Sequence, residues 1–395
     1  MSSQRIKWKI EYEKSVICQN FDRKGYVRTE GDDWNIFWAT VGTVKQIFNP
    51  DSSQRLMDNQ VINHFPNHYE LTRKDNLVKN IKRYIKEQQK EGKQVDDFLP
   101  VTYLLPSDYS LFVEEFRRYP NAMWIMKPSN AAQGKGIFII NKLQQIKKWS
   151  TGRFARDQQT YVVSRYIENP LLIGGKKFDL RIYVLITSFR PLRMYLGDGF
   201  ARFCNVKYSS DVGEIDNPFM HLTNVSIQKH NEDYNYNHGG KWNVQNLRLY
   251  LESTRGLAAT QKLFNDIDDL LVHSAKAVQN VMINDRHCFE CYGYDLLLDD
   301  NLKPWLVEVN ASPSLNATTQ MDKEMKTTLI RDVLDIVVPE EFGSDYRGPN
   351  TQGPCRDQGD FVVLYDEAAS NEKALREAEL KAGQKEKKKA VRSWK

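Results

Sequence analysis

The chain has 395 residues, of which 41% are hydrophobic and 27% charged, and it contains 8 tryptophans and 19 tyrosines. This composition is typical of a globular protein with a sizeable core and does not fit a disordered chain. No segment approaches about 18 consecutive apolar residues and no apolar run follows the first basic residues, so neither a membrane span nor a signal peptide is expected. The scattered cysteines fit a reducing compartment such as the cytoplasm, and a net charge of +5 permits an acidic partner without requiring one.

The composition along the chain predicts four regions. Short apolar runs separated by turn residues fill 1–70, which we take as an N-terminal subdomain. Residues 71–187 and 188–340 each mix strand and helix patterns and are taken as a central and a C-terminal subdomain. Residues 341–395 are rich in glycine, proline and charge, so they are predicted to be a linker and a charged, flexible tail, in which the run FVVLYDE could return as a strand.

A helix is predicted from Thr72 to Gly92 because its apolar residues, among them Leu77, Ile81 and Tyr84, recur on one helical face. The other face is basic. It carries Lys79, Lys82, Arg83 and Lys86. Such a face is either simply solvated or a docking surface for an acidic polymer, and the sequence leaves both interpretations open.

The run CFECYGYDLLLDDNLKPWLVEVN is predicted to form a β-hairpin. If its turn is centred between Asn301 and Leu302, Asp295 faces Glu308 across the two strands, and Asn310 shares a face with Glu308. Such hard oxygen ligands suit Mg²⁺ that also contacts phosphates. A solvated hairpin edge explains Glu308 poorly, because its neighbours are apolar and a carboxylate buried among them needs a charged partner.

A glycine-rich turn, QGKG, lies between the strand-like runs WIMKP and IFII. It matches neither a P-loop nor a dinucleotide fingerprint, but a glycine flap between two strands can fold over a triphosphate with its amides facing the oxygens. Lys127 lies within the first of these runs, and Lys177 opens a strand in which Asp179 and Arg181 share its face. Buried lysines are rare without an anionic partner, so phosphates are one explanation and salt bridges with carboxylates are the other.

Several separate motifs occur in an order that resembles the tubulin tyrosine ligase-like family: WIMKP, AQGKGIF, YIENPLLIGGKKFDLRIYVL, HLTNVSIQKH, HGGKW, CFECYGYDLLLD and WLVEVNASPSL. The resemblance covers about residues 5–340 and is closest to the glutamylase branch. It implies an α/β (α+β) ATP-grasp fold in which residues 1–350 form one domain, with the nucleotide between the central and C-terminal subdomains.

The resemblance also assigns roles to individual residues. Glu308 and Arg181 would be catalytic, Arg202 and Lys241 would bind L-glutamate, and Asp295, Glu308 and Asn310 would bind Mg²⁺. Gln133 would touch the acceptor protein, as would the basic residues Lys79, Lys82 and Arg83. The residues expected to bind ATP are Lys127, Gln133, Gly134, Ser164, Arg165, Tyr166, Ile167, Lys177, Phe178, Asp179, Thr223 and Asn224.

The activity implied is polyglutamylation of tubulin, in which ATP phosphorylates a carboxylate and the amine of glutamate attacks the acyl phosphate. Two fixed cations suit an incoming amino acid with two carboxylates. The implied partners are the acidic tails of tubulin in microtubules and further subunits of a polyglutamylase complex, at the cytoskeleton, in the axoneme of a cilium or flagellum and at the basal body. Neither nucleic acid nor a membrane is expected as a partner. A glycylase, a tyrosine ligase and an inactive microtubule-binding subunit remain the alternatives.

Overall fold

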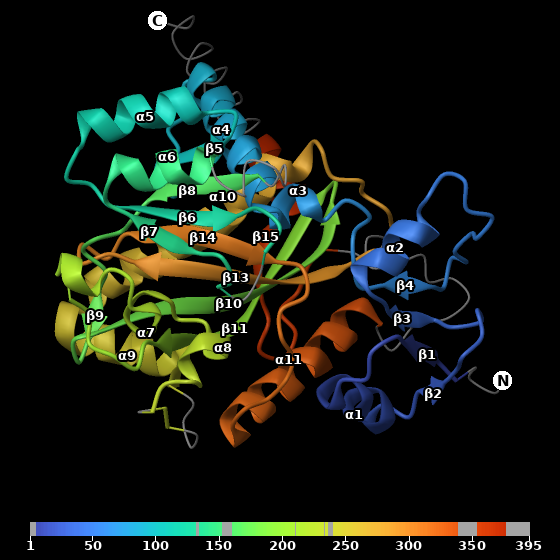
Figure 1. The fold of residues 1–395 in the computed structure, drawn as a ribbon. Helices are drawn as coiled ribbons and strands as arrows, with labels where there is room; N and C mark the ends of the chain where they lie inside the picture. The colour runs from blue at the N-terminus through green and yellow to red at the C-terminus, as the bar shows by residue number, and fades with distance from the viewer. Residues whose placement is uncertain are drawn as a thin grey trace, which may run out of the picture.

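The computed structural model describes residues 5–131, 134–151, 160–209, 211–232, 234–235, 240–338 and 354–376. Its described strands form a parallel sheet near the N-terminus, a small antiparallel sheet and a large antiparallel sheet. Figure 1 shows the small sheet lying over the large one, with the N-terminal sheet to one side. The protein is therefore a mixed α/β chain with several sheets.

The N-terminal sheet has the strand order β2-β1-β3-β4 and lies beside the first helices. Its core contains Trp8, Phe21 and Ile36, and it continues into α11, which lies beside α1 although the two helices are far apart in the sequence (Figure 1). The elements are β1 (Lys7–Ile10), α1 (Ser15–Arg23), β2 (Val27–Arg28), β3 (Ile36–Trp38), α2 (Val41–Ile47), β4 (Val61–Ile62), α3 (Tyr69–Thr72), α4 (Lys74–Lys90) and α11 (Gln320–Val337).

The small sheet has the order β5-β8-β6-β7 and is antiparallel. One of its faces packs on a cluster of its own, with Phe112 of α5 edge-on to Trp124 of β6. Alternation along β6 and β8 then leaves Lys127, Val162 and Ser164 on the other face, toward the large sheet. The elements are β5 (Thr102–Leu105), α5 (Tyr109–Arg118), β6 (Trp124–Pro128), β7 (Phe138–Ile140), α6 (Leu143–Thr151) and β8 (Tyr161–Arg165).

The large sheet has the path β12-β11-β10-β13-β14, with β15 paired to β11 and β9 to β10. Its core strand β10 places Phe178, Leu180 and Ile182 on a face that packs with α10, while Lys177 and Asp179 belong to the face toward the small sheet. Its strands are β9 (Leu172–Ile173), β10 (Lys176–Phe189), β11 (Leu192–Phe203), β12 (Lys241–Asn243), β13 (Glu290–Leu298), β14 (Pro304–Asn310) and β15 (Val362–Asp366); its helices are α7 (Pro218–His221), α8 (Val225–Gln228), α9 (Val244–Arg255) and α10 (Leu257–Gln279), with a 3₁₀ turn at Val212–Glu214.

The N-terminal sheet is attached to the large sheet through both backbone and side chains. The amide of Ile62 donates to the carbonyl of His287 at 2.8 Å, and the amide of Phe289 donates to the carbonyl of Ile62 at 3.1 Å. Buried Glu290 then lies 2.8 Å from Nδ1 of His64 and accepts from the Phe65 amide at 3.1 Å. These contacts satisfy a carboxylate that would otherwise be costly to bury.

The predicted helix over Thr72–Gly92 and the predicted hairpin are both confirmed, as α4 and as β13 with β14. Of the region predicted as linker and tail, 341–395, the structure describes residues 354–376, where β15 pairs with β11 and Phe361 is only 1% exposed. The returning strand predicted there is confirmed. Among the described residues, no helix combines the length and apolarity that crossing a bilayer would require.

Candidate active site

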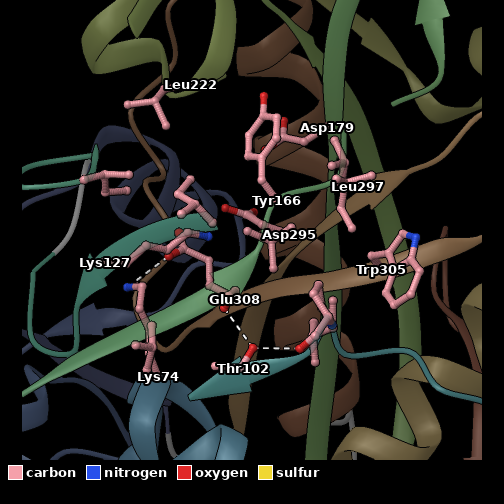
Figure 2. Close-up of a pocket in the computed structure, with 18 of the residues that line it drawn as sticks. Lys74, Thr102, Lys127, Tyr166, Asp179, Leu222, Asp295, Leu297, Trp305 and Glu308 are labelled. Atoms are coloured by element: carbon pink, nitrogen blue, oxygen red, sulfur yellow. Dashed lines mark hydrogen bonds and ion pairs between the residues drawn. The ribbon is translucent and has the colours of Figure 1, made fainter. Parts of the chain in front are cut away.

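A cavity lies between the small and the large sheet, and its walls come from both. β6 and β8 line it from one side and β10, β13 and β14 from the other, while α4 and the 221–224 segment close its ends. Figure 2 shows side chains from these elements pointing toward one another across it. Most of the residues predicted to bind ATP line this cavity. They are Lys127, Gly134, Ser164, Arg165, Tyr166, Ile167, Lys177, Asp179, Thr223 and Asn224.

Two lysines face each other across the cavity, one from each sheet. Burial lowers the pKa of Lys127 to about 8; Glu308 opposes this shift, and the cations Lys74 and Lys177 add to it. Burial lowers the pKa of Lys177 as well. A buried ammonium is stabilised by an anion, so both lysines suit a ligand with several negative charges.

Lys177 also begins a short chain of hydrogen bonds. Its ammonium donates to the hydroxyl of Tyr166 at 2.9 Å and to the carbonyl of His221 at 3.1 Å. Nε2 of His221 lies 3.0 Å from the carbonyl of Glu214, which can only accept, so His221 is protonated there and its Nδ1 accepts from the Tyr166 hydroxyl at 2.8 Å. Burial lowers the pKa of His221, which agrees with a neutral ring. The chain fixes Lys177 at the cavity wall.

Lys74 was not predicted from the sequence, although it is a third cation at the site. Its ammonium lies 3.1 Å from Oε2 of Glu308 and donates to the carbonyl of Ala131 at 3.1 Å. It therefore joins the start of α4, the segment after β6 and the carboxylate of β14 (Figure 2). In the sequence, only the position of Lys74 beside the apolar face of the helix could have indicated a role at the site. Other lysines of α4 share that feature, so the sequence does not single out Lys74.

Asp295 and Glu308 are direct partners across β13 and β14, as the hairpin prediction required. Nδ2 of Asn310 lies 3.4 Å from Oε1 of Glu308, so these three side chains occupy one place on the sheet. Two carboxylates and an amide oxygen are a donor set that fits Mg²⁺, with phosphates and water completing its shell. Among the described residues no group of three or more His, Cys, Asp or Glu side chains is arranged so that it could hold a metal ion.

Asp295 is also held by two arginines. Nε and Nη2 of Arg181 donate to its two oxygens at 2.5 Å and 2.9 Å, and Nη2 of Arg202 lies 2.9 Å from Oδ2. Burial acts to raise the pKa of Asp295, but the two guanidinium groups outweigh it and hold that pKa well below the ordinary range. The two guanidinium groups therefore favour the ionised carboxylate of Asp295.

A second charged cluster lies beside the first. Lys241 of β12 is the register partner of Arg202, and its ammonium lies 2.9 Å from Asp322, which is also 2.9 Å from Lys326. Both lysines lie over the ring of Phe200. Burial lowers the pKa of Lys326, although Asp322 opposes the shift. Lys326 was not predicted from the sequence, and the structure places it with the predicted pair Arg202 and Lys241.

Of the residues predicted to bind ATP, Phe178 is not among those that line the cavity and Gln133 cannot be placed, and the basic residues predicted for the acceptor protein lie on α4 outside the cavity lining. The ring of Phe178 lies in the core on the opposite face of β10 from Lys177 and Asp179, because neighbouring residues of a strand alternate. Gln133 lies outside the described residues. The ammonium of Lys82 donates to the Thr102 carbonyl at 2.5 Å, so it is already partly engaged, although its residue is exposed.

Buried cations lie opposite paired carboxylates between two antiparallel sheets, an arrangement that is compatible with an ATP-grasp-like ligase. The family model of the tubulin-tyrosine ligase family matches residues 51–345, and the chain belongs to that family.

Three curated relatives are similar over most of their length. The probable alpha-tubulin polyglutamylase Ttll1 of Tetrahymena thermophila is 53% identical over 391 residues, which cover 93% of this chain and 94% of that protein. The probable tubulin polyglutamylase ttll-9 of Caenorhabditis elegans is 46% identical over 322 residues, covering 80% and 76%. The probable tubulin polyglutamylase TTLL9 of Rattus norvegicus is 42% identical over 396 residues, covering 86% and 85%.

Proposed function

We propose that this chain is a tubulin polyglutamylase, an ATP- and Mg²⁺-dependent ligase that joins L-glutamate to glutamate side chains in the acidic tails of tubulin. The names of its relatives support the reaction. The observation that carries the proposal is the meeting of Lys127 from the small sheet with Lys177, Asp295 and Glu308 from the large sheet around one cavity. These groups match the charges of a phosphoryl transfer to a carboxylate.

In this proposal ATP occupies the cavity between the small and the large sheet. The proposed subdomains are 1–70, 71–187 and 188–340, and the boundary after 187 falls within β10 of the large sheet. The base would lie along the segment Ser164–Ile167, beside the apolar residues Leu297 and Trp305. The phosphates would lie toward Lys127, Lys177 and Lys74. Gly134 has a φ of +77°, and a Cβ there would meet Ile227 at 2.5 Å, so the turn after β6 requires glycine at this point.

Asp295, Glu308 and Asn310 would hold Mg²⁺, which supplies positive charge to the oxygens of the transferring phosphoryl group. Arg181 acts through Asp295, whose two oxygens it orients. Lys74 forms an ion pair with Glu308 and holds its carboxylate in the cavity wall. These residues therefore arrange the negative and positive groups before the reaction begins, which is where most of the rate enhancement of such a site arises.

The incoming L-glutamate would be bound by Arg202 and Lys241, with Lys326 as a further cation beside them. Two carboxylates held by fixed cations leave the α-amine free to attack the acyl phosphate of the acceptor side chain. Because water would hydrolyse that intermediate, the flap that contains Gly134 and Gln133 would cover the site during the reaction. A tyrosine ligase would need an aromatic pocket here, and a glycylase would leave one of the cations unused.

The acceptor is an acidic polymer, and Lys79, Lys82, Arg83 and Lys86 of α4 lie on an exposed face suited to it. A protein with this activity would work at microtubules, in cilia or flagella and at basal bodies, together with further subunits of a polyglutamylase complex. No helix in the described residues suits a bilayer, and neither a membrane nor a nucleic acid is part of the proposal.

The direct test is incubation of the protein with tubulin, ATP, Mg²⁺ and labelled glutamate, followed by mass spectrometry of the tubulin tails. Glutamate should be added in the wild type and absent with Glu308→Gln, whose folding is checked by circular dichroism. Parallel reactions with glycine and with tyrosine discriminate the alternative ligases. Absence of any incorporation by the wild type, with partner subunits present, would contradict the proposal and favour an inactive microtubule-binding subunit.

A further inference from the structure

The carboxylate of Asp179 belongs to two sites. Its residue lines the cavity proposed for ATP, and it is the direct register partner of Arg202 on the neighbouring strand. Nε of Arg202 donates to Oδ1 at 2.8 Å, and Nη2 donates to Oδ2. Both residues are buried, Asp179 to 6% and Arg202 to 6% exposure. This pair therefore connects the nucleotide cavity with the cations on β11 and β12.

The two-point contact determines which part of the guanidinium is available to a ligand. A guanidinium has five N–H donors in a planar fork. Asp179 accepts hydrogen bonds from Nε and Nη2 of Arg202, and Asp295 also accepts from Nη2, at 2.9 Å. Within the described part of the chain no residue accepts a hydrogen bond from Nη1. Because the fork is rigid, fixing the Nε–Nη2 edge also fixes the direction of the two Nη1 donors.

We infer that Asp179 is a positioning residue for the amino acid substrate: it orients Arg202 so that Nη1 is presented to a carboxylate of the incoming L-glutamate. The inference rests on the proposed function. It differs from the role that the sequence suggested for Asp179, a contact with the nucleotide. Both oxygens of Asp179 accept hydrogen bonds from Arg202. The free-energy cost of burying this ion pair is offset by its two-point geometry, and only while that geometry is kept.

The row of charges across the sheet supports this assignment. Lys241, Arg202 and Asp179 are consecutive register partners on β12, β11 and β10. Lys241 is fixed by Asp322, and Arg202 is fixed by Asp179. Each of the two cations proposed for glutamate therefore has its own buried carboxylate, which sets its position and leaves its remaining donors for the ligand.

The test is a calorimetric titration of L-glutamate, and separately of ATP, into the full chain and its variants. Asp179→Asn keeps the shape of the side chain but loses its charge and one acceptor. It should weaken L-glutamate binding by roughly tenfold, the effect of losing one charge-assisted hydrogen bond, while ATP binding changes less than about threefold. A loss of ATP affinity as large as the loss of glutamate affinity would overturn the inference and make Asp179 a nucleotide contact.

A double-mutant cycle separates positioning from a merely structural role. If Asp179 acts through Arg202, Asp179→Asn should not weaken glutamate binding further in an Arg202→Gln background. Additive losses would contradict the inference. Asp332→Asn is the matched control, because Asp332 is 1% exposed and accepts from Nε of Arg331 at 2.7 Å outside the cavity. It should lower thermal stability without changing either affinity.

The same experiment distinguishes the inference from the proposed function. A wild type that binds ATP but no L-glutamate would contradict the proposed function and, with it, the inference. A wild type that binds both, together with an Asp179→Asn variant that binds both equally well, would contradict the inference alone. Asp179→Glu, which retains the charge, guards against a folding defect: it should melt close to the wild type and bind L-glutamate better than Asp179→Asn does.

Discussion

Arg181 and Asp295 face each other across β10 and β13 and form a two-point ion pair in the protein interior. Arg181 is 8% exposed and Asp295 is 2% exposed. The side chain of Arg181 lies over Gly293, where a Cβ would come within 3.1 Å of its Cδ. The position of Asp295, the carboxylate proposed to bind the metal, thus depends on Arg181 of the neighbouring strand. Gly293 leaves the space that the side chain of Arg181 occupies.

Substitution of Arg181 should destabilise the protein. Arg181→Gln leaves the Asp295 carboxylate buried with a single guanidinium partner, and loss of one member of a buried pair costs about 3–5 kcal/mol. The free energy of unfolding in urea measures this effect. Arg376→Gln is the control, because Arg376 forms an exposed pair with Glu372 and its loss should cost less than about 1 kcal/mol. Equal losses would contradict the importance of burial.

ATP binding should depend on pH through Lys127. The pKa of Lys127 is lowered to about 8 by burial, with Glu308 opposing and Lys74 adding to the shift, so the ammonium loses its proton as the pH rises through that value. Affinity for ATP should be constant below about pH 8 and fall above it, by at most about tenfold per pH unit. Calorimetric titration of ATP at a series of pH values measures this affinity. Lys127→Met should bind weakly with no such decline; an identical profile in that variant would assign the titration to another group.

Gly293→Ala should impair the site by moving Arg181. The added Cβ would lie 2.8 Å from Cβ of Pro313 and 3.1 Å from Cδ of Arg181. Overpacking of this kind costs about 1–3 kcal/mol, and the displaced arginine would release Asp295. Thermal unfolding and glutamate incorporation measure the two effects. Gly42→Ala in α2 is the control, because its Cβ would meet only Thr40 Oγ1 at 3.7 Å and stability should not fall.

Reversal of charge on α4 should weaken the use of tubulin. Lys79→Glu combined with Lys86→Glu should raise KM for tubulin and reduce the dependence of that KM on salt, because exposed charges attract a polymer through a screened interaction. KM for L-glutamate should not change. Lys45→Glu combined with Lys323→Glu, which reverses two exposed lysines of α2 and α11, is the control with the same change in net charge. If both pairs of substitutions raise KM for tubulin equally, the basic face of α4 is only a solvated surface.

The sequence predicted the pairing of Asp295 with Glu308, but the reason for it lies in the structure. At the tip of the hairpin Leu298 pairs with Pro304 and Leu296 with Leu306, so the turn is centred on Asn301 rather than between Asn301 and Leu302. A bulge then shifts the register by one residue between Leu296 and Asp295. Bulges of this kind have a weak sequence signal, although they re-aim side chains next to functional sites.

The elements were more predictable than the contacts between them. Periodicity located α4, β10 and the hairpin because it reports which residues are apolar along one segment. Lys74 was missed because its partner, Glu308, lies on another element of the fold. Lys326 was missed because its partner, Asp322, lies beside another cation as well. Most of the residues that the motif resemblance assigned to ATP line the cavity, but the resemblance could not distinguish the inward Lys177 and Asp179 from Phe178 between them.

The N-terminal sheet is joined to the large sheet by hydrogen bonds between β4 and the start of β13. Because Ile62 exchanges backbone hydrogen bonds with residues beside Glu290, and Glu290 contacts His64, the N-terminal sheet and the large sheet form one hydrogen-bonded body. The small sheet is the part that faces that body across the cavity (Figure 1). If the proposed nucleotide site opens by a movement of the small sheet, the N-terminal sheet, residues 7–62, would stay with Asp295 and Glu308 while Lys127 moves away from them.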